Sequence, residues 1–204
     1  MEFSFNRSVR IVAVVLLLLA VTQAIYTGLY IAELAVPRRA LWGLEGLLFV
    51  TLAALAGAAM VQDPRRALGW SAIAFSAALN VVQVGVGLTL FGPFREAAQS
   101  VEALAPVAGA VVVFSFFVYN AAKLLLGLAA LSFGLSQLRE GARLLGRCAV
   151  AIGLIAVIAN AAVMVMGRDS IVPSQLAGAS GVLATVLLAL CLWSHTRPAE
   201  PMPN

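Results

Sequence analysis

The chain has 204 residues, of which 62% are hydrophobic and 11% are charged, with a formal net charge of +4. A soluble domain is about one quarter charged, so this composition excludes an ordinary water-soluble fold. The positive charge comes from arginines between apolar segments, a pattern of membrane proteins and not of nucleic-acid-binding surfaces.

Six apolar runs follow one another along the chain. Each is about twenty residues or longer, which is enough to cross a hydrocarbon core of about 30 Å as a helix. Runs such as 11–20 do not alternate apolar and polar residues, so a β-barrel is excluded. We predict an all-α, polytopic integral membrane protein: a bundle of about six transmembrane helices in one domain over residues 1–196. The predicted spans are 9–34, 40–62, 67–92, 106–136, 144–167 and 173–194.

The start of the chain has features of a secretory signal peptide, because Arg7 and Arg10 precede an apolar run. The run continues through Ile31 and Ala32, past any expected cleavage site, so we predict an uncleaved first span.

The arginines predict the orientation of the spans, because positive residues are retained on the cytoplasmic side. With the N-terminus inside, eight arginines lie on the cytoplasmic side and four on the other. We therefore expect a multi-pass protein of the cell inner (plasma) membrane with both termini cytoplasmic. The proline-rich tail, 197–204, is predicted to be disordered in the cytoplasm.

The longest outer connection contains a helical repeat of apolar residues, including Phe94, Val101 and Leu104, with Arg95 and Glu102 on the opposite face. This pattern predicts a short amphipathic helix lying on the outer membrane surface. An interfacial connector and a lid over a site both remain open.

Polar residues lie in the middle of several predicted spans, where an unsatisfied amide is costly because no water can pair with it. Asn80 and Gln83 lie in the third span, Asn120 in the fourth and Asn160 in the fifth. They should face other helices, either to form a polar pocket or to hold the bundle together by hydrogen bonds. The first span adds Gln23, Tyr26, Tyr30 and Glu33 on its outer half.

Lys123 is the only lysine, and it falls near the middle of the fourth span. An ammonium there costs about 3 kcal/mol or more, so it should be paired. Its side chain should lean toward the N-terminus of its helix. Glu45 is the only carboxylate inside an apolar run, but its depth differs by about 12 Å, too far for contact unless the helices tilt or shift. Lys123 is therefore either a structural residue held by Asn80, Gln83 or Asn160, or part of a substrate, ion or proton site.

No catalytic constellation is found in the sequence. Ser180 lies in a glycine-rich stretch, but the only histidine, His195, is fifteen residues later on the same span, about 22 Å away. Cys148, Cys191 and His195 have no paired spacing typical of a metal site. We expect no catalytic residue, no metal and no cofactor, and an enzyme is the least favoured function.

The leading hypothesis is a small transporter, channel or ligand-binding membrane protein with a polar site around Lys123. The alternative is a structural or accessory subunit of a membrane complex. The expected partners are the lipid bilayer and either a small anionic ligand or another membrane protein, with no nucleic acid. The candidate ligand-binding residues are Lys123, Asn120, Asn80, Gln83, Asn160, Glu45 and Tyr26.

Overall fold

The computed structural model describes residues 4–195, apart from the side chain of Arg168, so the predicted tail at 197–204 lies outside the described residues. The described part is all-helical, which confirms the predicted class, and contains no strand. A short helix, α4 (Phe91–Ser100), and three 3₁₀ turns lie in the connections. The six long helices are α1 (Phe5–Ile31), α2 (Arg38–Gln62), α3 (Ala67–Thr89), α5 (Ala105–Arg139), α6 (Arg143–Met166) and α7 (Ser174–His195).

Each of the six long helices is long and apolar enough to cross a membrane, with α3 and α5 taken together with the short helices that flank them. They coincide with the six predicted segments, with ends that differ by a few residues. The end of α1 shows why. Glu33 adopts the left-handed conformation (φ 56), and the N–H of Leu34 donates to the carbonyl of Leu29 at 3.0 Å. This termination motif stops the helix at Ile31, before the predicted end at residue 34.

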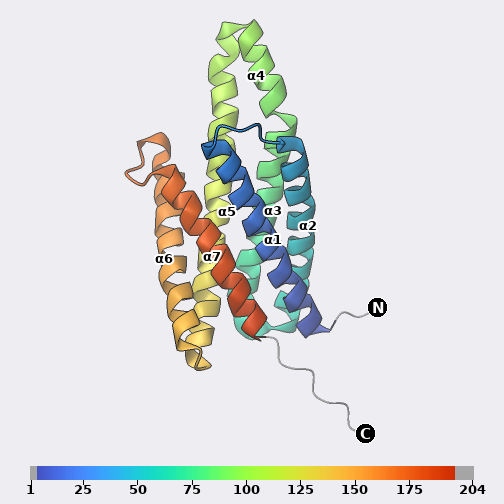
Figure 1. Cartoon of the computed structure of the whole chain (residues 1–204), viewed down its shortest axis with the longest axis vertical. Coiled ribbons are helices and arrows are strands. Elements are labelled where there is room, and N and C mark those ends of the chain that lie inside the picture. Colours follow the sequence, from blue (N-terminus) through green and yellow to red (C-terminus); the bar gives the residue numbers. More distant parts are fainter. Residues whose placement is uncertain (1–3, 196–204) are drawn as a thin grey trace.

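The helices pack as a bundle in which α5 has the most neighbours. It packs against α3, α6 and α7, whereas α1 packs against α7 and α2. Figure 1 shows α1 and α7 crossing one face of the bundle, with α1 beginning and α7 ending at the same end. We call this the terminal end, and the opposite end, which carries α4, the hairpin end.

The hairpin formed by α3, α4 and α5 extends beyond the other helices. At 35 residues, α5 is about 52 Å long. Figure 1 shows α4 continuing along the long axis of the molecule instead of lying across the bundle end, the direction that we expected of a helix on the membrane surface. The cause is local: Leu90 keeps a helical backbone between α3 and α4, and its carbonyl accepts a hydrogen bond from the N–H of Phe94 at 3.0 Å.

Two pairs of glycines bring the backbones of α5 and α6 together. A Cβ at Gly127 would lie 2.9 Å from the carbonyl oxygen of Gly153, and a Cβ at Gly146 would lie 2.9 Å from that of Gly134. Such close approach requires residues without side chains. The glycine faces therefore fix α6 against α5 and leave the opposite flanks of both helices to other contacts.

Candidate functional site

Lys123 lies in the interior of the bundle, with 1% of its surface exposed. Its Nζ donates a hydrogen bond of 2.5 Å to Oε1 of Gln23 on α1, and lies 5.3 Å from the centre of the Tyr119 ring. Because Tyr119 is one turn earlier on α5, the side chain leans toward the N-terminus of its helix, as predicted. The hydrogen-bond partner differs from the three predicted ones, Asn80, Gln83 and Asn160.

Gly181 on α7 makes room for the lysine stem. A Cβ at this position would lie 2.8 Å from Cδ and 3.2 Å from Cβ of Lys123. The side chain therefore passes across α7 to reach α1, and a larger residue at position 181 would push it out of this path.

Glu45 on α2 is also buried, with 6% exposed. The hydroxyl of Thr22 donates to its Oε1 at 2.8 Å. Thr22 and Gln23 are neighbours on α1, so one short stretch of this helix supplies the partner of the carboxylate and the partner of the ammonium. We call Thr22, Gln23, Glu45 and Lys123 the central cluster.

The two charged groups of the central cluster do not touch each other. Among the described residues, no ion pair within 4.0 Å joins Glu45 to Lys123, although the two are close enough to interact electrostatically. An ammonium has three N–H donors and a carboxylate has about four acceptor positions. Chemically, the cluster offers an anion a hydrogen-bond donor and offers a cation or proton an acceptor.

The predicted amides are used elsewhere. Asn80 and Asn120 each donate to the carbonyl four residues earlier on their own helix, at 3.0 and 2.7 Å. Gln83 on α3 donates to the hydroxyl of Ser115 on α5 at 3.4 Å. Of the seven predicted site residues, Lys123 and Glu45 thus both contact one stretch of α1. Asn80, Asn120 and Gln83 form hydrogen bonds outside the central cluster.

Asn160 connects two helices. Its Nδ2 donates to the carbonyl four residues earlier on α6 at 2.8 Å, and to the carbonyl of Ala177 on α7 at 3.2 Å. Its Oδ1 is buried without a hydrogen-bond partner. This geometry favours the helix-joining interpretation of Asn160.

Tyr26, the last predicted site residue, belongs to an aromatic stack at the hairpin end. Its ring centre lies 6.5 Å from that of Tyr30 and 5.8 Å from that of Trp42, which in turn lies 5.9 Å from Phe91. Next to the stack, a hollow of about 720 Å³ is lined by residues of the α1–α2 connection, including Tyr30 and Glu33. Since Tyr26 is one turn from Thr22 and Gln23, the stack lies between this hollow and the central cluster.

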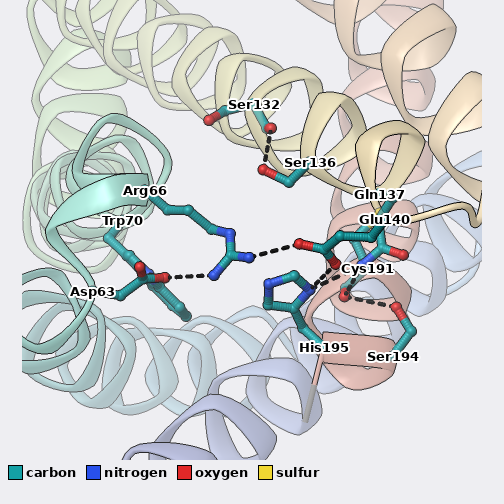
Figure 2. Close-up of polar contacts among 10 residues, drawn as sticks. All are labelled: Asp63, Arg66, Trp70, Ser132, Ser136, Gln137, Glu140, Cys191, Ser194 and His195. Carbon is teal, nitrogen blue, oxygen red and sulfur yellow. Dashed lines mark hydrogen bonds and ion pairs between the residues drawn. The ribbon is translucent and has the colours of Figure 1, made fainter. Parts of the chain in front are cut away.

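A second polar cluster, which the sequence did not predict, ties the terminal end together (Figure 2). Arg66 contacts Asp63 at 3.0 Å and Glu140 at 2.8 Å, and Nδ1 of His195 contacts the other oxygen of Glu140 at 3.0 Å. We call these four residues the terminal network. It joins the ends of α2, α5 and α7 to the start of α3. Glu140 and His195 are far from Asp63 and Arg66 in the sequence.

The terminal network is braced by neutral donors. Trp70 donates from Nε1 to Asp63 at 3.2 Å, and Nε2 of Gln137 lies 3.2 Å from Nδ1 of His195. The two cysteines differ in burial, since Cys191 is buried and Cys148 is exposed. Among the described residues, no group of three His, Cys, Asp or Glu side chains could hold a metal ion.

Comparison with protein-family models, with curated proteins and with solved structures gave no match.

Proposed function

We propose that the chain is an integral protein of the cell inner membrane, crossed six times by its long helices. The length and apolar character of these helices support this. Among the described residues, arginine is more frequent at the terminal end, where seven lie, than at the hairpin end, where four lie. In our proposal the terminal end, with both chain termini, is therefore cytoplasmic and the hairpin end faces outward.

Within this membrane protein, the central cluster is the binding site of a small anionic ligand, and the chain is a transporter, channel or ligand-binding protein. The observation that carries this proposal is the separation of Lys123 from Glu45. In a low-dielectric interior, two opposite charges are costly apart and partly compensate each other when in contact. Each is instead held by a neutral side chain of α1. An anionic solute that contacts the ammonium would supply the missing compensation for Lys123, while Glu45 keeps its hydrogen bond from Thr22.

From the outside, the nearest hollow lies at the α1–α2 connection, and a solute moving from it to the site would have to pass the stack that contains Tyr26 and Trp42. At the other end of the bundle, the ion pairs of Arg66 with Asp63 and Glu140 join the helix ends. In our proposal, the site is reached from the outer side past this stack.

Native mass spectrometry of protein extracted gently from membranes tests the proposal. Wild type is compared with Lys123→Met and with a control, Thr185→Val. Thr185 is equally buried, but its hydroxyl bonds only within α7, to the carbonyl of Gly181 at 2.8 Å. We expect a small anionic species on wild type and on the control, and its loss from Lys123→Met. The same bound species on all three proteins, or none on any, contradicts the proposal.

A second candidate function is a structural or accessory subunit of a membrane complex. It is favoured by three phenylalanines on the hairpin-end half of α5, Phe114, Phe116 and Phe117, which are 52%, 55% and 49% exposed. Exposed aromatic side chains are enriched in the centres of protein interfaces. Co-purification of a membrane protein with wild type and with Lys123→Met alike, lost on Phe116→Ala, would favour this function over the first.

A further inference from the structure

Three arginines surround the turn between α5 and α6 at the terminal end. Arg139 ends α5, Arg143 begins α6 and Arg147 follows one turn later. All three are exposed, and none of them forms an ion pair within the described residues.

The acidic residues that the structure describes at this end are already engaged. Asp63 is bound by Arg66, and Glu140 is bound by both Arg66 and His195, as Figure 2 shows. No carboxylate of the described chain is therefore paired with the arginines of the turn.

The position of two of these arginines is also unfavourable for their own helix. Arg143 and Arg147 lie in the first two turns of α6, whose N-terminus carries a partial positive charge. Neither intrahelical electrostatics nor an ion pair accounts for them. An anion from outside the chain would balance both the arginine charges and the helix end.

The three arginines lie on one flank of the α5–α6 pair. Successive residues of an α-helix are rotated by about 100° around its axis. Measured from Gly134 and Gly146, which meet at the interface, this rotation places Arg139 of α5 and the two arginines of α6 on the same side of the helix pair. The same side carries Leu135 of α5 and Leu154 of α6, which are 42% and 49% exposed. The flank is therefore a basic patch at the end of an apolar surface between two helices.

We propose that this flank binds an anionic phospholipid, with the headgroup phosphate on Arg143, Arg147 and Arg139 and an acyl chain along the leucines. Arginine suits the phosphate because its planar guanidinium can donate two hydrogen bonds to one anion. Basic patches between helices near the cytoplasmic leaflet are typical binding sites for anionic headgroups. The proposal shares the membrane location of the proposed function but none of the central cluster.

The test uses the full chain in nanodiscs or mixed micelles with equal amounts of phosphatidylglycerol and phosphatidylcholine of matched acyl chains. Native mass spectrometry counts the lipids that stay bound to wild type, to Arg143→Gln/Arg147→Gln, and to a control, Arg10→Gln/Arg65→Gln. The control removes two exposed arginines from the same end of the bundle, but from α1 and from the α2–α3 connection.

We expect wild type and control to retain phosphatidylglycerol preferentially, and the Arg143→Gln/Arg147→Gln variant to lose roughly 30-fold in preference, about fivefold per arginine. Wild type without a preference for phosphatidylglycerol overturns the proposal. An equal loss in both double variants also overturns it, because general charge attraction would then suffice. Since Lys123 is intact in every variant, ligand binding at the central cluster is unaffected by either result.

Discussion

The central cluster and the terminal network contain the same kinds of charged group, arranged in opposite ways. In the terminal network Arg66 touches two carboxylates, at 3.0 and 2.8 Å. In the central cluster Lys123 and Glu45 are more deeply buried, yet each contacts a neutral residue of α1. Contact between opposite charges matters most where water is excluded. The cluster that most needs a direct pair lacks one, so stability alone does not explain it, and this difference supports a ligand site.

The largest expected effect comes from removing the partner of the lysine. Gln23→Leu leaves the Lys123 ammonium without its hydrogen bond, and we expect a loss of about 1.5–3 kcal/mol in the free energy of unfolding, since bonds to charged groups have this size. Lys123→Met combined with Gln23→Leu should recover most of that loss. A double-mutant cycle, measured by denaturant unfolding in mild detergent, gives the coupling energy. Additive effects of the two changes would show that the contact is not important for stability.

A second prediction concerns the path of the lysine stem. Gly181→Ala places a methyl group 2.8 Å from Cδ of Lys123, so either the side chain or α7 has to move. We expect a loss of about 1–3 kcal/mol, the usual cost of overpacking a buried site. Gly178→Ala on the same helix is the matched control, because its methyl group would meet only the Tyr119 hydroxyl, at 3.6 Å. The control should be neutral or slightly stabilising, since alanine favours helix. Equal thermal stability of both variants would contradict the packing of Lys123 against α7.

The smallest effect is expected in the terminal network. The side chains of Arg66 and Glu140 are 24% and 43% exposed, so water screens their ion pair. Arg66→Gln should cost about 1 kcal/mol or less, and the cost should shrink further at high salt. The neighbouring Arg65→Gln is the control. If Arg66→Gln destabilised the protein more than Gln23→Leu at every salt concentration, the ranking of the two clusters would be reversed.

Much of the fold follows from the sequence, because the length of an apolar run depends on local composition. The six long helices coincide with the six apolar runs, and a short helix is present in the long connection, at 91–100. Its orientation was not predictable from amphipathicity. It depends on the helical backbone of Leu90 and on packing against α5.

The candidate site was less predictable. The sequence identified Lys123 and Glu45 as exceptional, since each is a charge inside an apolar run, and it placed Gln23 among the polar residues of the first span. It did not identify Gln23 as the partner of the lysine, because depth along a helix does not reveal which helices are neighbours. The long lysine side chain reaches α1 across α7, and only the packing of the bundle determines that. The terminal network was missed for the same reason, since Arg66 and Glu140 are 74 residues apart.

The most direct test of the binding site is an experimental density map of the protein kept in its native lipids throughout purification. Our account predicts density for a small anionic solute in contact with Nζ of Lys123, with Gln23 shifted to accommodate it. A map in which the ammonium contacts only Gln23, or pairs directly with Glu45 with nothing between them, would contradict the account and leave Lys123 a structural residue of the bundle.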